Sequence, residues 1–412
     1  MITRPIWYLR EILKKVWARV IAFALLAVFA SGLARVLAPI IPDDFAMSAG
    51  AGAVESLLGV LTSSMLAVTT FSLSIAVSAF AAAAGSATPR ATILLQEDNT
   101  TQNVLATFLG AFLFGLVGLI AIKAQLYGAS GRVILFFFTI AVIGLVVVAL
   151  IRWIGHLMQF GRMDDILDRV EKAASRALGR RLENPWLGGN MLIGTIPAHA
   201  TPIVANETGY VQHIDMQALQ DCAEDAGSRI FLHCLPGRFV APEQPLLYVD
   251  PPPASEDASK AIRRAVVIGT RRTFEGDPRF GLIVLSEIAS RALSPAVNDP
   301  GTAIDILGRH VRILSQWRSD SDVEVEFSRI FVPAIALQDL MEDAFRPISR
   351  DGAALSEVQI RLQKGLASLC LAAPDVFAAP CDQMAREALQ RAEGAALLPA
   401  ELARIRASAP LR

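Results

Sequence analysis

The sequence predicts an α-helical membrane protein with four transmembrane helices, followed by a C-terminal cytosolic α+β domain that contains a small β module. Two observations support this fold class. Hydrophobic residues make up 53% of the 412 positions and charged residues 19%, and the long, nearly uncharged runs are confined to residues 1–155. The remaining residues mix charged and apolar positions at the periods of helices and strands, which is typical of a soluble domain.

Four apolar runs within residues 1–155 are long enough to cross a bilayer as helices. A segment buried in lipid must satisfy its own backbone polar groups, which requires about 20 helical residues. The predicted spans cover residues 20–37, 54–84, 104–124 and 133–151. The second run is longer than a bilayer requires, so we expect it to tilt or to continue beyond the membrane.

The distribution of basic residues predicts the orientation of these spans. Five basic residues precede the first span, whereas residues 38–54 contain two aspartates but neither Lys nor Arg. Arg152, Arg162 and Arg169 follow the fourth span. Because loops rich in Lys and Arg stay in the cytoplasm, we expect a multi-pass membrane protein with cytoplasmic N- and C-termini.

The second predicted span carries many hydroxyl side chains. Four of them follow one another at intervals of seven, four and four residues and share one helix face: Ser63, Thr70, Ser74 and Ser78. This face lines either a water-filled path, with Glu55 at its outer mouth, or a tight contact with another helix. The middle of each span lacks Asp, Glu, Lys, Arg and His, which argues against a pump or a proton relay.

The soluble part begins with a polar linker helix predicted over residues 156–187. Short apolar runs separated by Gly, Pro and Asn predict a small β module over residues 188–254. Its segments GYVQHID and LPGRFVAPEQPLLYV are similar to the half-motifs of barrel-sandwich hybrids, the fold of biotinyl and lipoyl carriers. No lysine occupies a modification turn, so we expect a structural, barrel-sandwich-like module. Residues 255–412 show mainly helical periodicity.

Two groups of polar residues in the last domain form a candidate site for an anionic ligand. Arg271 and Arg272 lie in a basic segment, and Asn298, Asp299 and His310 lie at and after the start of a predicted helix. The alternative interpretation is structural. Charged runs commonly form solvated ion pairs, and Asp299, followed by a proline, is a natural N-cap.

Several kinds of chemistry leave no motif in the sequence. The five histidines and four cysteines lack metal-ligand spacing, so we expect no metal site. The phosphate-binding loop, the dinucleotide fingerprint and the nucleophile elbow are absent, so we expect no cofactor and no enzymatic activity. The net charge of −1 predicts no nucleic-acid partner.

Three segments occur in a fixed order after the spans: GYVQHID, GTRRTFEGDPRFG and RALSPAVNDPGTA. With them, the chain resembles the bacterial predicted membrane proteins catalogued as domain of unknown function 2254. The resemblance covers nearly the whole chain, and its last two segments are the most specific. It implies the same membrane topology, in the bacterial inner (cytoplasmic) membrane, and says little about activity.

Three functions stay open at this point. The favoured one is a homo-oligomeric channel or pore, in which the second span conducts ions and the cytosolic domain assembles or gates it. The alternative is a membrane-anchored sensor or scaffold whose cytosolic domain binds a partner or ligand. The third is an enzyme acting near the inner leaflet through the region from Arg271 to Asp299. The expected partners are the lipid bilayer and further copies of the chain.

Overall fold

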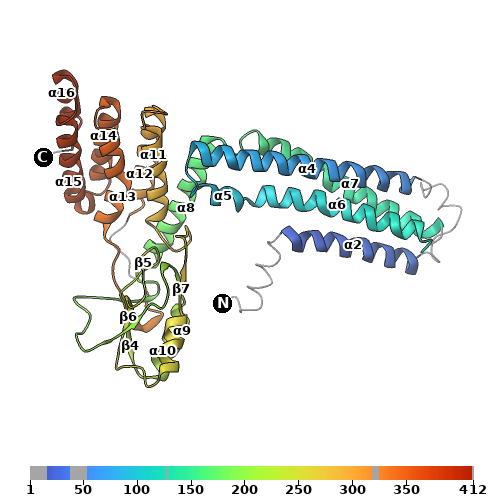
Figure 1. Ribbon diagram of the computed structural model, residues 1–412, viewed down its shortest axis with the longest axis horizontal. Helices are drawn as coiled ribbons and strands as arrows, with labels where there is room; N and C mark the ends of the chain where they lie inside the picture. Colours follow the sequence, from blue (N-terminus) through green and yellow to red (C-terminus); the bar gives the residue numbers. More distant parts are fainter. Residues whose placement is uncertain (1–15, 38–52, 127–128, 318–323, 411–412) are drawn as a thin grey trace. The chain divides into compact units, whose positions relative to one another are not determined.

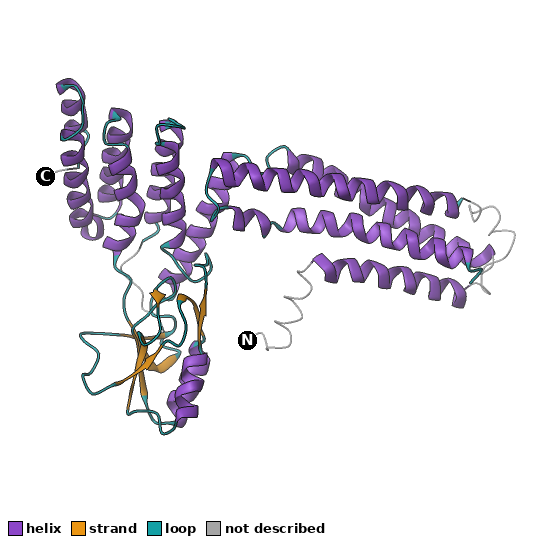
Figure 2. Cartoon of the chain, in the orientation of Figure 1, coloured by secondary structure: helices purple, strands orange, loops and turns teal. Residues whose placement is uncertain are grey.

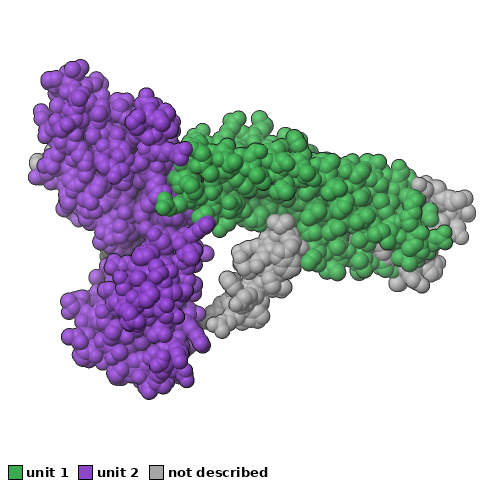
Figure 3. Space-filling view, viewed as in Figure 1, with its two compact units in different colours: residues 1–166 green, residues 167–412 purple. Residues whose placement is uncertain are grey.

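The computed structural model describes residues 16–37, 53–126, 129–317 and 324–410. The chain forms two compact units, residues 1–166 and residues 167–412, and each is described by itself (Figure 3). Most of the basic flank and the acidic loop that predict the orientation lie outside the described residues.

The first unit is a bundle of long apolar helices (Figure 1). It contains α2 (Val16–Leu37), α4 (Val54–Ser86), α5 (Thr92–Gln96), α6 (Asn99–Lys123) and α7 (Ala129–Leu157). α6 packs against α2, α4 and α7. In the most apolar stretch of each helix, 50% of the α6 residues but only 17% of the α4 residues are buried. α6 is therefore the central helix, whereas α4 leaves most of its surface uncovered.

Glycines of α6 let the neighbouring helices approach closely. A Cβ atom on Gly115 would lie 2.3 Å from Thr62 Oγ1 of α4, and one on Gly110 would lie 2.4 Å from Phe23 Cδ2 of α2. Large apolar side chains nearby are fully buried: Leu58, Phe108, Phe114 and Leu135. The interior of the described bundle is thus apolar and closely packed.

Three helical stretches are long and apolar enough to cross a membrane: Val54–Ser86, Thr92–Lys123 and Gly131–Leu157. They coincide with the second, third and fourth predicted spans. The first predicted span, residues 20–37, falls on α2, which is not among the three. A fourth crossing therefore stays a prediction.

The second unit combines a β module with a group of helices (Figure 2). It opens with α8 (Met163–Glu183), most of which belongs to this unit. The β module contains β1 (Gly189–Met191), β2 (Thr201–Val204), β3 (Gly209–Ile214), α9 (Met216–Asp225), β4 (Arg229–Leu232), β5 (Phe239–Val240), β6 (Pro245–Asp250), α10 (Glu256–Arg264), β7 (Val266–Gly269) and β8 (Phe327–Val332). The other helices are α11 (Phe280–Ala292), α12 (Pro300–Leu314), α13 (Leu337–Asp351), α14 (Ser356–Ala372), α15 (Pro374–Glu393) and α16 (Pro399–Ala407).

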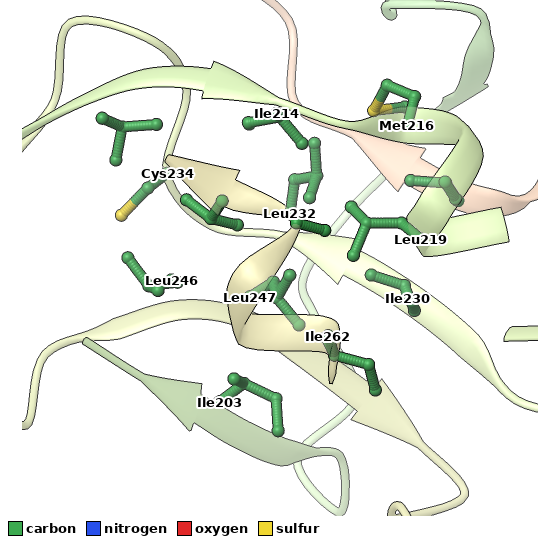
Figure 4. Packing of buried hydrophobic residues seen from close by; sticks show 14 of the residues in the cluster. Ile203, Ile214, Met216, Leu219, Ile230, Leu232, Cys234, Leu246, Leu247 and Ile262 are labelled. Carbon is green, nitrogen blue, oxygen red and sulfur yellow. The ribbon is translucent and has the colours of Figure 1, made fainter. Parts of the chain in front are cut away.

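The β module consists of two sheets. The larger has the order β1-β8-β4-β6-β2, in which β8 runs parallel to β1 and β4 while the other pairs are antiparallel. The smaller, β5-β3-β7, is antiparallel. Leu219 of α9 and Ile262 of α10 meet Ile230 and Leu247 of the larger sheet in one apolar core (Figure 4). β8 joins this module from outside residues 188–254, after α11 and α12.

α8 is fixed within the second unit by a close helix contact and by ion pairs. A Cβ atom on Gly281 of α11 would lie 2.4 Å from the Cβ atom of Ala174, so only glycine allows this approach. Arg309 of α12 is buried and donates hydrogen bonds to Asp168 and Glu171 of α8, each at 2.7 Å. The predicted linker helix is therefore packed along most of its length.

Candidate anion-binding cavity

The hydroxyl face of α4 points away from the described bundle. All four predicted pore-lining hydroxyl residues have exposed side chains: Ser63, Thr70, Ser74 and Ser78. The first three each donate to the backbone carbonyl four residues earlier, at 3.0 Å. Glu55 forms an ion pair with Lys123, with 2.5 Å between Oε1 and Nζ. A path lined by this face would run between copies of the chain rather than through one bundle.

The residues predicted as an anion site lie in different environments. Asn298 and Asp299 are exposed at the start of α12. The Asp299 carboxylate accepts hydrogen bonds from Thr302 N at 3.1 Å and from Thr302 Oγ1 at 2.6 Å. The bond from the Thr302 hydroxyl is the main reason why the pKa of Asp299 lies below its ordinary value. Asp299 is thus an N-cap, as the sequence pattern predicts.

His310 and the arginine pair differ from that helix start, and from each other, in burial and in partners. His310 is fully buried, with Nε2 3.3 Å from the carbonyl oxygen of Leu282. Burial lowers the pKa of His310 to about 4, so its ring is neutral at pH 7. Arg271 is exposed, and its backbone oxygen accepts a hydrogen bond from Gln212 at 2.7 Å. Of the five predicted residues, Arg272 alone lines the cavity described next.

This cavity lies in the second unit and has a volume of about 340 Å³. Four segments line it: the end of α8, the loop from β4 to β5, the loop from β7 to α11, and the start of α13 with the residues before it. Its titratable lining residues are Arg181, His233, Arg238, Arg272, Asp277, Arg279 and Asp339. We call it the arginine cavity.

Arg181 is a buried cation with no counter-ion among the residues that the structure describes. Its residue is 7% exposed, and its Nε atom has no hydrogen-bond partner. Its Nη2 atom reaches only the carbonyl oxygen of Pro333, at 3.4 Å, and no carboxylate of the described residues pairs with it. Burial therefore lowers the pKa of Arg181 to about 10, which still leaves it charged at pH 7. Because burying an unpaired charge is unfavourable, the geometry suits an anion at this position.

Asp277 organises one wall of the arginine cavity. It is buried and accepts hydrogen bonds from Arg272 Nε at 2.6 Å and from the backbone N–H groups of Arg279 and Phe280 at 3.0 and 3.2 Å. It thereby satisfies the free N–H groups at the start of α11. Gly237 passes so close that a Cβ atom there would lie 2.2 Å from Asp277 Oδ2, and its φ is +94°. Only glycine fits this position without strain.

Arg279 is held by two carboxylates of α13. Its Nε and Nη2 atoms donate to Asp343 at 2.6 and 3.1 Å, and its Nη1 atom donates to Asp339 at 2.5 Å. This bidentate arrangement fixes the guanidinium in place. The Arg272 guanidinium is held by two contacts. Its Nε atom donates a hydrogen bond to Asp277, and its central carbon lies 5.4 Å from the centre of the Phe280 ring.

Positive charge exceeds negative charge in the arginine cavity. Among the described residues, its four arginines stand against three carboxylates, the lining residues Asp277 and Asp339 and the Arg279 partner Asp343, which leaves a surplus of one positive charge. Arg181 and Arg238 are the two arginines without an ion pair in this part of the chain. The described residues contain no group of three or more His, Cys, Asp or Glu side chains that could hold a metal ion. The site therefore suits an anion.

The sequence analysis did not predict three of the four arginines of this cavity, Arg181, Arg238 and Arg279. The position of Arg181 in α8 could have indicated its burial, because Arg181 follows the buried residues Leu178 and Ala174 by three and seven positions. It is thus an arginine on the apolar face of an amphipathic helix. Arg279 and Asp277 stand in the same segment, GTRRTFEGDPRFG, as Arg272.

The chain is similar to two mycobacterial proteins. An uncharacterized protein of Mycobacterium bovis and one of Mycobacterium tuberculosis are each 30% identical to it over 234 residues. The match covers 51% of this chain and 42% of each relative, so the chain spans less than half of their length. No solved structure matches the chain.

A family profile gives the broader relationship. The profile of the family described as Predicted membrane protein (DUF2254) matches residues 14–368. This range includes the three candidate spans and every residue that lines the arginine cavity. The chain therefore belongs to the family Predicted membrane protein (DUF2254).

Proposed function

We propose that the chain is a membrane-anchored sensor whose second unit binds an anionic ligand in the arginine cavity. The observation that carries the proposal is the buried guanidinium of Arg181, which no carboxylate of the described residues neutralises. Hydrogen bonds between arginine and an oxyanion are strong in a site shielded from water. We place this unit in the cytoplasm, following the distribution of basic residues around the spans.

Titration calorimetry on the full chain in nanodiscs tests the proposal. Inorganic phosphate and sulfate are the probes, and we expect saturable binding to the native protein. Arg181→Met keeps a side chain of similar length but removes the charge, and it should abolish binding. Arg176→Met is the matched control, because Arg176 is an exposed arginine of the same helix. Equal binding by the native protein and Arg181→Met would refute the assignment of the cavity.

A homo-oligomeric channel is the second candidate function, and the uncovered face of α4 favours it. Only 17% of the most apolar stretch of α4 is buried, and this helix exposes the four hydroxyl side chains of Ser63, Thr70, Ser74 and Ser78. In an oligomer these hydroxyls would face one another across a path for ions.

Current across a planar bilayer, recorded with the native protein and two variants, tests this second candidate. Ser74→Leu should abolish the current if the hydroxyl face lines the path. Ser86→Leu is the control, because Ser86 is also exposed on α4 and makes the same kind of backbone hydrogen bond outside that face. Absence of current from folded native protein would count against the channel.

A further inference from the structure

The arginine cavity is larger than a bare oxyanion requires. Its volume is about 340 Å³, whereas a water molecule occupies about 30 Å³ of liquid. Pockets for small organic ligands begin at about 300 Å³. A tetrahedral oxyanion alone would leave most of this space unfilled, so the cavity suits an anion that carries an organic group.

Two guanidinium groups of the arginine cavity are available for a dianion. Arg272 and Arg279 are paired with aspartates, whereas the buried Arg181 and the exposed Arg238 have no ion pair within the described residues. A phosphomonoester carries about −1.5 to −2 charges at pH 7, while a carboxylate or a phosphodiester carries a single one. The planar fork of a guanidinium also suits two phosphate oxygens at once.

Phe239 adds an apolar surface to this charged site. Its residue is 52% exposed and lines the cavity, whereas the next residue of β5, Val240, is buried in the core. The ring of Tyr210 meets Phe239 edge-on, with 5.2 Å between ring centres and 69° between planes. A single exposed phenylalanine is ordinary on a protein surface. One that lines the same cavity as four arginines provides a face on which a flat ring can stack.

We infer that the ligand is a phosphomonoester carrying a flat ring, such as a nucleoside monophosphate. Arg181 and Arg238 bind its phosphate, and Phe239 stacks on its ring. This inference rests on the proposed function, because the same cavity holds the phosphate in both.

Calorimetry with three ligands tests the inference on the full chain in nanodiscs of zwitterionic lipid. The ligands are inorganic phosphate, adenosine and adenosine monophosphate. We expect the monophosphate to bind roughly 5- to 100-fold more tightly than phosphate, which is the gain typical of stacking a base on an aromatic ring. Adenosine should bind more weakly than the monophosphate, because it lacks the charged group.

Two variants separate the ring from the phosphate. Phe239→Leu should reduce the affinity for the monophosphate to that for phosphate and leave phosphate binding unchanged. Arg181→Met should abolish the binding of both. Leu371→Ala is the control, because Leu371 is an exposed apolar residue of α14 that does not line the cavity.

The outcomes distinguish this inference from the proposed function. Equal affinities for phosphate and the monophosphate would overturn the role of the ring and leave the anion sensor intact. Adenosine binding as tightly as the monophosphate would overturn the role of the phosphate. Loss of monophosphate binding in nanodiscs that contain phosphatidic acid would assign the cavity to a lipid headgroup instead. Absence of binding by every phosphate ligand would overturn both proposals.

Discussion

Replacing Arg181 by methionine is expected to stabilise the protein in the absence of ligand. Burial of the charged guanidinium lowers the pKa of Arg181 from its ordinary value to about 10. At about 1.36 kcal/mol per pKa unit, the charged side chain destabilises the folded state by about 3 kcal/mol at pH 7. This penalty is fully present at every pH below about 10, and it disappears as the pH rises further, through the range in which the unfolded chain also loses the proton.

Thermal unfolding followed by the fluorescence of Trp186 and Trp317 measures this effect, since both residues lie in the second unit. Methionine keeps most of the apolar stem, so we expect Arg181→Met to raise the midpoint by roughly 6–12 °C. Phosphate at a hundredfold excess over its Kd should stabilise the native protein by about 2.7 kcal/mol and leave the variant unchanged. Arg176→Met should melt like the native protein. A lower midpoint for Arg181→Met would refute the reasoning, because it would mean that the guanidinium is already neutralised.

Gly237→Ala is expected to lower the free energy of unfolding by about 1–3 kcal/mol, because its φ is +94° and the new Cβ atom would meet the Asp277 carboxylate. Urea denaturation measures this loss, and an unchanged midpoint would contradict the close approach. Arg309→Met should destabilise the second unit by about 2 kcal/mol, since Asp168 and Glu171 would lose their shared partner; faster cleavage by a protease is the readout, and equal cleavage rates would argue against it. Burial lowers the pKa of His310 from 6.5 to about 4. As the pH falls from 6.5 to 4, the imidazole of the unfolded chain becomes protonated before that of the folded chain, so the free energy of unfolding should decrease over this range. His310→Gln should flatten that part of the stability profile, and an unaltered profile would exclude His310 as its source.

Features that depend only on residues close together in the sequence could be predicted. Three predicted spans coincide with long apolar helices because burial in lipid selects for residue type at every position of the run. The start of α12 was predictable for a similar reason, since Asp299 and Pro300 act within one helical turn.

Features that depend on distant residues could not be read in this way. β8 pairs in parallel with β4 although three helices, α10, α11 and α12, lie between them in the chain, and no local pattern encodes such a pairing. The burial of Arg181 likewise depends on how α8 packs against the rest of the second unit. Without that packing, Arg180 and Arg181 look like an ordinary solvated helix end. The arginine cavity therefore depends on the packing of four segments that lie far apart in the sequence.

The continuity of α8 has a mechanical consequence. This helix runs unbroken for 21 residues, and its first residue, Met163, follows the end of α7 at Leu157 after a short connection. Arg181 lies near its other end, about 27 Å away at 1.5 Å per residue. Between these ends the helix is bound to α12 through Arg309 and lies in close contact with α11 at Gly281, so a shift of Arg181 toward an arriving anion would displace helices of the same unit. Distances between spin labels at Lys172 and on α12, measured with and without phosphate, would record that motion.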